Sequence, residues 1–216
     1  MSVLVTGSCG GIGKAIVEKF LSAGYDVVGL DIQRAVVTHA RYTHVRADVA
    51  DPPEMGPFEI VVCAHGIQSP DERTIDVNLN GVVNVLEKYA FLPGIRAVLT
   101  VASASARNGA EFPRYVAGKA GVVGYTKNVA LRLAPFGAVA NSLSPGGVLT
   151  ESNAPVLNDP TLRNEALNES LLKKWATPEE IAEWAFFLTV VNRSMTGEDV
   201  LVDNGEQLRS RFVWPK

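Results

Sequence analysis

A tyrosine and a lysine stand four positions apart in a segment whose apolar residues recur with helical spacing. Tyr115 and Lys119 would lie one turn apart on the same face of that helix, so their side chains could act together. A phenol, with a pKa of about 10 in water, is a poor base near neutrality, but a nearby ammonium favours its phenolate form. The pair could therefore transfer a proton to or from a ligand. A surface tyrosine beside a solvated lysine would show the same spacing by chance, so the spacing alone does not indicate a catalytic pair.

The first apolar run of the chain leads directly into a glycine-rich segment that precedes a helical pattern. It reads Thr6-Gly7-Ser8-Cys9-Gly10-Gly11-Ile12-Gly13. Glycines at 7, 11 and 13 permit a tight turn and let the backbone approach a pyrophosphate, while the helix N-terminus offers free N–H groups and a positive dipole end. An ordinary glycine-rich turn is the alternative. The strand before it and the helix after it favour a dinucleotide site.

An acidic residue, Asp31, ends the next apolar run. A carboxylate at this position accepts hydrogen bonds from the ribose hydroxyls of an adenosine and repels a 2′-phosphate. Asp31 therefore predicts a preference for NAD over NADP. Arg34 stands close enough to complicate this prediction, although a lone arginine in a loop is more often a solvated surface residue.

Short apolar runs alternate along the chain with longer segments of helical period. Runs that are apolar throughout are typical of parallel strands covered on both faces, so the sequence predicts a Rossmann-type, doubly wound α/β fold. In the first helical segment, Ile12, Ile16, Phe20 and Ala23 share one face, and Gly24 stands at the expected C-terminal cap. The predicted strands are 3–5, 27–30, 60–62, 98–101, 139–143 and 200–202.

The bulk composition is that of one globular domain. The 216 residues are 47% hydrophobic and 20% charged, and no repeat or linker divides them, so we expect a single domain over 1–216. The net charge of −3 gives no electrostatic reason to bind nucleic acid or an anionic membrane. A small-molecule partner is expected.

The start of the chain and its cysteines bear on its location. An apolar strand begins after two residues, which leaves no room for a signal peptide, and no apolar stretch is long enough to span a bilayer. Cys9 and Cys63 have neither CxxC spacing nor a nearby histidine pair, so we expect no metal site and no disulfide framework. These features together favour a cytoplasmic protein.

The order of the motifs resembles that of the classical short-chain dehydrogenase/reductase family over nearly the whole chain. The glycine-rich turn matches the family's cofactor motif, and Tyr115 and Lys119 match its catalytic pair. The other matching segments are Asp48-Val49, Asp76-Val77-Asn78-Leu79-Asn80-Gly81, Val101-Ala102-Ser103, Asn141 through Thr150, Thr177 through Ala182, and Thr196-Gly197 through Asp203-Asn204-Gly205.

The resemblance implies a role for each catalytic residue. Tyr115 would be the general acid/base, and Ser103 would bind the substrate oxygen. Lys119 would bind the nicotinamide ribose and lower the Tyr115 pKa, and Asn78 would hold a water that passes the proton onward. Taken singly, Asn78 could instead cap a helix, and Ser103 could be a strand-end hydroxyl bonded to backbone.

By the same resemblance, a set of residues along the carboxyl ends of the strands would contact the cofactor. They are Gly7, Cys9, Gly11, Ile12, Gly13, Asp31, Ile32, Asp48, Val49, Ala64, Gly66, Tyr115, Lys119, Val148 and Thr150.

The chain departs from the family in three places. Cys63-Ala64-His65-Gly66 replaces the usual Asn-Asn-Ala-Gly, which could alter the support of the sheet; we expect His65 to pack rather than to carry protons. Segments 31–48, 48–63 and 66–78 are short enough to remove or truncate flanking helices, as in the bacterial 3α-hydroxysteroid dehydrogenase/carbonyl reductase subgroup. The interval from Ser103 to Tyr115 is one residue short, which leaves Ser105 as a lesser candidate for the substrate-binding hydroxyl.

The resemblance implies an oxidoreductase that transfers a hydride between NAD(H) and a secondary alcohol or ketone. Its substrate loop would be 151–174, and a homodimer or homotetramer would form through helices 81–89 and 115–133. A dinucleotide-binding sensor or scaffold without turnover is the alternative. An epimerase or dehydratase is disfavoured, because the chain is short and ends where a classical member of the family ends.

Overall fold

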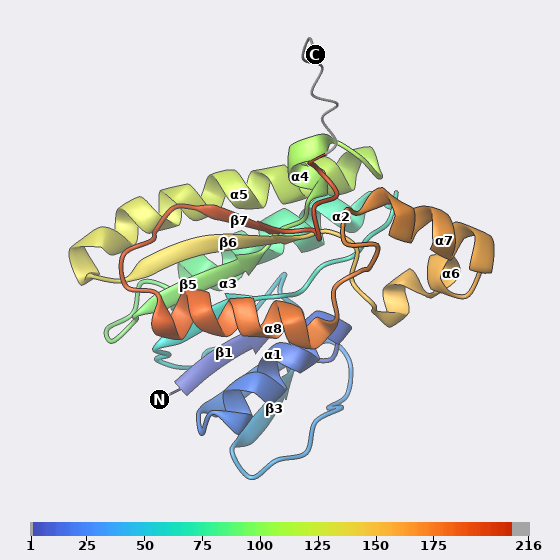
Figure 1. Ribbon diagram of the computed structural model, residues 1–216. Coiled ribbons are helices and arrows are strands. Elements are labelled where there is room, and N and C mark those ends of the chain that lie inside the picture. The colour runs from blue at the N-terminus through green and yellow to red at the C-terminus, as the bar shows by residue number, and fades with distance from the viewer. Residues whose placement is uncertain (1, 209–216) are drawn as a thin grey trace.

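Seven parallel strands form the central sheet of the computed structural model, which describes residues 2–208 (Figure 1). Their order is β3-β2-β1-β4-β5-β6-β7, so consecutive strands run outward to both sides of β1. Ligands of doubly wound sheets bind at this switch point, beyond the carboxyl ends of the strands. The predicted fold is confirmed. The strands are β1 Ser2–Thr6, β2 Asp26–Asp31, β3 Tyr42–Arg46, β4 Ile60–Cys63, β5 Ala97–Val101, β6 Val139–Pro145 and β7 Asp199–Val202.

Helices cover both faces of the sheet. On one face α1 (Gly11–Ser22) packs against α8 (Pro178–Phe186), and on the other lie α3 (Gly81–Tyr89) and α5 (Pro113–Leu133). Successive strand residues point to opposite faces, which is why buried residues alternate between two cores. In β1, for example, Val3 and Val5 belong to the α1–α8 core and Leu4 to the α3–α5 core.

The first helix follows the predicted pattern except at its end. Ile16 and Phe20 are fully buried, and Ile12 packs partly buried against the same core. The helix stops at Ser22, so Ala23 is an exposed cap residue rather than part of the buried face. Gly24 has φ +84°, the left-handed conformation that glycine provides after a helix.

Strand β3 has no counterpart among the predicted apolar runs. Its sequence, Tyr-Thr-His-Val-Arg, contains no fully buried residue, because β3 is an edge strand that pairs only with β2. The segments before and after it, 32–41 and 47–59, contain no helix, as their shortness predicts. In place of a helix, Phe58 packs edge-on against Tyr89 at 5.7 Å, and the Tyr89 hydroxyl donates to the Pro53 carbonyl.

Shorter elements lie near the carboxyl ends of the strands. The helices α6 (Ala154–Leu157) and α7 (Pro160–Glu169) extend away from the sheet at the right of Figure 1. The others are α2 Arg73–Ile75, η1 Asp76–Asn80, α4 Ser105–Asn108, η2 Ala134–Phe136, η3 Glu151–Asn153 and η4 Phe187–Val191.

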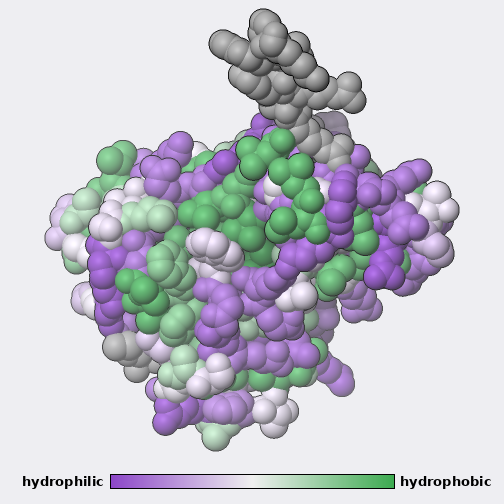
Figure 2. Space-filling view, in the orientation of Figure 1, coloured by the Kyte–Doolittle hydropathy of each residue, from purple (hydrophilic) through white to green (hydrophobic). Residues whose placement is uncertain are grey.

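The surface of the molecule is partly hydrophobic at one edge of the sheet. Figure 2 shows hydrophobic side chains gathered over the edge strand β7, whose four residues are all half-buried. Within residues 2–208, no helix is both long and apolar enough to cross a membrane. Cys9 and Cys63 are free thiols.

Candidate active site

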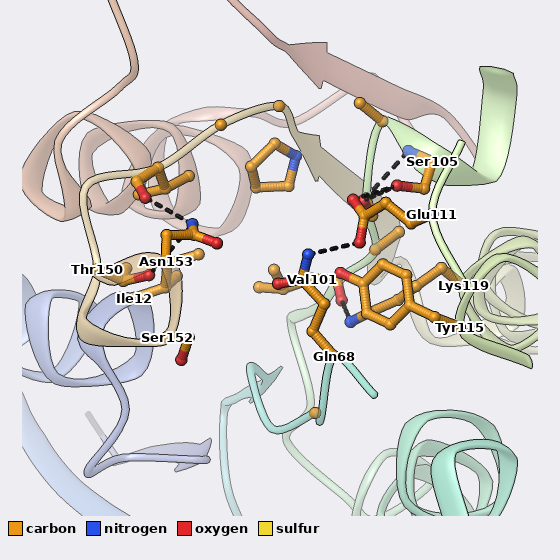
Figure 3. A pocket seen from close by; sticks show the side chains of 18 of the residues that line it. Ile12, Gln68, Val101, Ser105, Glu111, Tyr115, Lys119, Thr150, Ser152 and Asn153 are labelled. Carbon is orange, nitrogen blue, oxygen red and sulfur yellow. Dashed lines mark hydrogen bonds between the residues drawn. The ribbon is translucent and has the colours of Figure 1, made fainter. Parts of the chain in front are cut away.

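A cavity of about 430 Å³ opens at the carboxyl ends of β1, β4, β5 and β6 (Figure 3). It brings together Ser103, Tyr115 and Lys119, which come from the end of β5 and the first turns of α5. Nine of the predicted cofactor contacts also line it, namely Gly11, Ile12, Gly13, Ala64, Gly66, Tyr115, Lys119, Val148 and Thr150. The motifs predicted to be catalytic and those predicted to bind the cofactor therefore line one cavity.

Tyr115 and Lys119 lie one turn apart on α5, as predicted. Pro113 begins the helix, and its fixed φ suits the first helical position, so Tyr115 falls in the first turn at the mouth of the cavity. The Lys119 Nζ lies 5.8 Å from the centre of the Tyr115 ring and donates a hydrogen bond of 2.8 Å to the Val101 carbonyl. The lysine is buried, so this carbonyl at the end of β5 holds its ammonium in place.

Burial dominates the electrostatics of this pair. It raises the pKa of Tyr115 to about 12, against the lowering effect of the Ser103 hydroxyl and with a further rise from the Glu111 charge. Burial also lowers the pKa of Lys119 to about 8, while the charge of Glu111 raises it. The net shift of the Tyr115 pKa is upward, because desolvation of the phenol outweighs the lowering effect of Ser103. The role of Lys119 in lowering this pKa stays a prediction.

Ser103 is better placed than Ser105 to bind a ligand. The Ser103 hydroxyl donates a hydrogen bond to the Ser105 Oγ at 3.1 Å, and the Ser103 Oγ accepts one of 3.1 Å from the Ser105 N–H. The Ser105 hydroxyl in turn donates to the Glu111 carboxylate at 2.7 Å. Ser105 is thus committed to Glu111, while the Ser103 hydroxyl stands close enough to Tyr115 to lower its pKa.

Asn78 lies behind the cavity rather than on its wall. It sits within the π-helical turn η1, fully buried, and its side chain binds both the N–H (2.8 Å) and the carbonyl (2.9 Å) of Ile67. It is therefore no helix cap, and it fixes the loop that follows β4. A Cβ on Gly66 would lie 3.2 Å from the Asn78 Oδ1 and 3.3 Å from the Lys119 Nζ, so this glycine lets the two side chains approach.

The glycine-rich turn is shaped by contacts that exclude side chains. Gly7 has φ +68°, and a Cβ there would lie 2.5 Å from the Cα of His65. A Cβ on Gly11 would lie 2.7 Å from the Thr150 Cγ2, on the far wall of the cavity. The first N–H groups of α1 have no partners within the helix, and the first residues of α1, Gly11, Ile12 and Gly13, line this cavity. These residues fit the phosphates of a dinucleotide.

Gly13→Ala is expected to damage this turn. Its Cβ would stand 2.0 Å from the Gly7 carbonyl oxygen, so the turn or the helix must shift. We expect a loss of about 1–3 kcal/mol of folding free energy and a Kd for NADH at least tenfold weaker, measured by thermal unfolding and fluorescence titration. Gly10→Ala is the stability control, because its Cβ would have 3.5 Å to the nearest atom. An unchanged Tm and Kd in Gly13→Ala would contradict the close packing of the turn.

The predicted adenosine contacts lie along the same edge, outside the cavity. The Asp31 carboxylate accepts 2.9 Å hydrogen bonds from the N–H groups of Cys9 and Gln33, which fixes it beside the glycine-rich turn. Ile32 is 61% exposed next to it. The Asp48 Oδ1 accepts from the Ala50 N–H at 2.9 Å, and Val49 is buried. The Arg34 side chain is exposed, as expected of a surface loop.

His65 ties two neighbouring strands together at their carboxyl ends. Its Nδ1 shares a 2.5 Å hydrogen bond with the Thr6 Oγ1, which joins the end of β4 to the end of β1. Burial, helped by the Lys119 charge, lowers the His65 pKa to about 3. Its Nε2 has no hydrogen-bond partner among residues 2–208. His65 is thus neutral at physiological pH and packs, as the sequence predicts, rather than carrying protons.

The buried neutral state of His65 predicts sensitivity to acid. Below pH 6.5 the unfolded chain binds a proton at this histidine, while the folded chain does not until about pH 3. Stability that is present above pH 6.5 is therefore lost as the pH falls, by about 2 kcal/mol between pH 7 and pH 5. Denaturant unfolding at both pH values should show this loss in the wild type and a smaller one in His65→Gln, which cannot titrate. Equal losses in the two proteins would contradict the assignment.

Several residues that line the cavity were not predicted from the sequence, Glu111 and Gln68 among them. Glu111 and Gln68 meet over the cavity, where the Gln68 Nε2 donates to the Glu111 Oε2 at 2.5 Å. They come from segments 43 residues apart, so no local pattern connects them. The one available signal was an acidic residue inside the shortened interval between Ser103 and Tyr115.

Comparisons with known proteins agree with this arrangement. A model of the enoyl-(acyl carrier protein) reductase family matches residues 68–207, and a model of the NAD-dependent epimerase/dehydratase family matches residues 3–114. The first match contains Ser103, Tyr115 and Lys119, and the second contains the glycine-rich turn. The description of the second family names NAD, which supports the binding of a nicotinamide dinucleotide.

Similar proteins extend over nearly the whole chain. The oxidoreductase UcpA of Escherichia coli is 31% identical over 250 residues, covering 96% of this chain and 94% of its own. The ligand-free aldohexose dehydrogenase of Thermoplasma acidophilum has a TM-score of 0.86 at 27% identity, over 100% of this chain and 97% of that one. A 4-hydroxyisoleucine dehydrogenase mutant complexed with NADH and succinate shares the fold, with a TM-score of 0.87 at 22% identity over 98% and 100% of the chains.

Proposed function

The chain belongs to the short-chain dehydrogenase/reductase family of oxidoreductases, and on that premise we propose that it transfers a hydride between NAD(H) and a secondary alcohol or ketone. One observation carries the proposal: Ser103, Tyr115 and Lys119 converge on the same cavity that the glycine-rich turn lines. Tyr115 is the general acid/base, and Ser103 holds the substrate oxygen beside it. A sensor without turnover has no need of Ser103, Tyr115 and Lys119 in one cavity. Their convergence therefore argues against the sensor alternative.

The protonation state of Tyr115 favours one direction of proton transfer. With a pKa of about 12, the phenol is protonated near neutral pH and can donate its proton to the oxygen of a ketone as that oxygen gains charge. The hydride that completes the reduction is the chemistry that the bound nicotinamide supplies. In the oxidative direction the phenol must first lose its proton, so Tyr115 accepts the alcohol proton more readily as the pH rises.

Lys119 and Asn78 lie close to each other beside Gly66. Lys119 is held by the Val101 carbonyl, and Gly66 lets it approach Asn78. In our proposal Lys119 also binds the nicotinamide ribose, and Asn78 holds a water that passes the Tyr115 proton onward. The pKa of Lys119, about 8, suits a group that gains and loses protons in this range.

We also propose NAD as the preferred cofactor. Support comes from the position of Asp31 at the end of β2, where two N–H groups fix its carboxylate beside the glycine-rich turn. Each of its oxygens accepts one of these bonds and keeps capacity for a ribose hydroxyl. A 2′-phosphate at the same place would meet a negative charge.

The remaining proposals concern the substrate loop and the assembly. Segment 151–174 forms η3, α6 and α7, and its Ser152, Asn153 and Val156 line the cavity, which supports a role in substrate binding.

The absence of helices from segments 32–41 and 47–59 supports a compact architecture like that of the 3α-hydroxysteroid dehydrogenase/carbonyl reductase subgroup. A homodimer or homotetramer through α3 and α5 would cover Leu131, which is 76% exposed.

A panel of secondary alcohols and ketones tests the function. The purified protein is incubated with each alcohol and NAD or NADP, and with each ketone and the reduced cofactors. We expect NADH absorbance to appear with at least one alcohol, and to disappear with the matching ketone. Tight NADH binding with no turnover of any substrate in either direction would instead support the sensor.

A further inference from the structure

Glu111 occupies a strained position at the mouth of the cavity. It lies in the short connection between α4 and α5 and has φ +88°, a conformation that residues other than glycine rarely adopt. Such strain persists where the surrounding structure enforces it, and it is common at ligand sites. Here the enforcement is visible, because the Glu111 carboxylate accepts hydrogen bonds from the Ser105 hydroxyl at 2.7 Å and from the Gln68 amide at 2.5 Å.

The strained backbone directs the carboxylate toward the reacting groups. Glu111 lines the same cavity as Ser103 and Tyr115, and Figure 3 shows its side chain reaching in from the rim between Ser105 and Gln68. Its charge raises the pKa of both Tyr115 and Lys119, so it acts electrostatically on the catalytic pair. A ligand held by Ser103 and Tyr115 therefore lies within the field of the Glu111 charge.

The charges around the cavity favour one kind of ligand. Glu111 presents its carboxylate at the rim, whereas Lys119, the one lysine or arginine among the described residues that lines the cavity, is buried and bound to the Val101 carbonyl. A carboxylate only accepts hydrogen bonds. The Glu111 side of the cavity thus suits a ligand with donor groups and disfavours an anionic one.

We propose that Glu111 determines substrate specificity by accepting a hydrogen bond from a donor group, an ammonium or a hydroxyl, on the carbon next to the reacting carbinol. The two bonds from Ser105 and Gln68 occupy part of its capacity and hold the carboxylate in one orientation, which leaves acceptor positions for the substrate. Carboxylate-bearing substrates are excluded by repulsion. This inference rests on the proposed function and names the class of alcohol that the site takes.

Four probes that differ in a single group test the proposal. They are 1-amino-2-propanol, 1,2-propanediol, 2-butanol and 3-hydroxybutyrate, which share a secondary carbinol and carry an ammonium, a hydroxyl, a methyl and a carboxylate on the CH2 group next to it. For the wild type we expect kcat/KM to fall in that order. Glu111→Gln should lower kcat/KM at least tenfold for the amino alcohol, raise it for 3-hydroxybutyrate and leave 2-butanol within about twofold.

Two further variants separate charge from structure. Glu111→Asp keeps the charge and should keep the wild-type order. Glu72→Gln removes an exposed carboxylate that pairs with Arg114 outside the cavity, and should leave all four values unchanged. A change by the same factor for all four probes in Glu111→Gln, or a wild-type preference for 3-hydroxybutyrate, would overturn the proposal while leaving the proposed function intact. No turnover of any probe by the wild type would count against both.

Discussion

Tyr115→Phe is expected to lower kcat by about 10²–10⁴-fold, the contribution typical of a general acid/base. The substitution removes only the hydroxyl, so the ring keeps its place on α5 beside Lys119. The Kd for NADH should therefore stay within about twofold of the wild-type value. Steady-state kinetics with the best substrate of the panel measure the first quantity, and fluorescence titration of NADH measures the second.

The pH profile gives the same prediction a second readout. The phenol has a pKa of about 12, so the fraction present as phenolate rises with pH throughout the neutral range. Oxidation by the wild type should accelerate with rising pH, while the residual activity of Tyr115→Phe should lack this rise. Tyr125→Phe is the matched control, because Tyr125 lies on the same helix but donates its hydroxyl to Glu87 at 2.6 Å, away from the cavity. Normal turnover by Tyr115→Phe would show that Tyr115 is not the acid/base.

Asp31→Asn is expected to weaken the preference for NADH over NADPH by about tenfold to hundredfold. The asparagine keeps the size of the side chain but removes the charge that would repel a 2′-phosphate, and one like-charge contact costs an interaction of that order. Arg46 of β3 is the register partner of Asp31 in β2, so a positive charge remains near this position after the substitution. Titration of both reduced cofactors measures the ratio of their Kd values.

Asp48→Asn is the control for this change. Asp48 is the second acidic residue at this edge, and its carboxylate accepts the Ala50 N–H beyond the end of β3. We expect Asp48→Asn to shift the two Kd values by the same factor. An unchanged ratio in Asp31→Asn, or a wild type that binds the two cofactors equally, would remove the role given to Asp31.

Much of the fold follows from local sequence because most strands are buried on both faces. Six of the seven strands overlap the runs that the sequence predicts as strands, and the first helix shows its buried face through Ile16 and Phe20. Strand β3 could not be found in this way. It lies at the edge of the sheet, where one side is open to solvent and polar residues are tolerated, so its sequence carries no apolar signal.

Some features of the candidate site depend on spacing along the sequence, and others depend on contacts between distant segments. The pairing of Tyr115 and Lys119 depends only on helical spacing, and the structure brings the two together. The rise in the Tyr115 pKa depends on burial by distant segments, and the bond between Thr6 and His65 joins residues 59 positions apart. The orientation of Glu111 similarly depends on Gln68. Such features arise only when the chain is folded, so spacing along the sequence could not reveal them.

Transfer of deuterium from the substrate to the cofactor is the most direct test of hydride transfer in this cavity. A secondary alcohol that carries deuterium on its carbinol carbon is oxidised with NAD, and the NADH formed is analysed by mass spectrometry. We predict that each NADH carries one deuterium, and that oxidation is slower than with the unlabelled alcohol if the hydride step limits the rate. NADH without deuterium, or loss of the label to water, would contradict direct hydride transfer between the substrate and the nicotinamide.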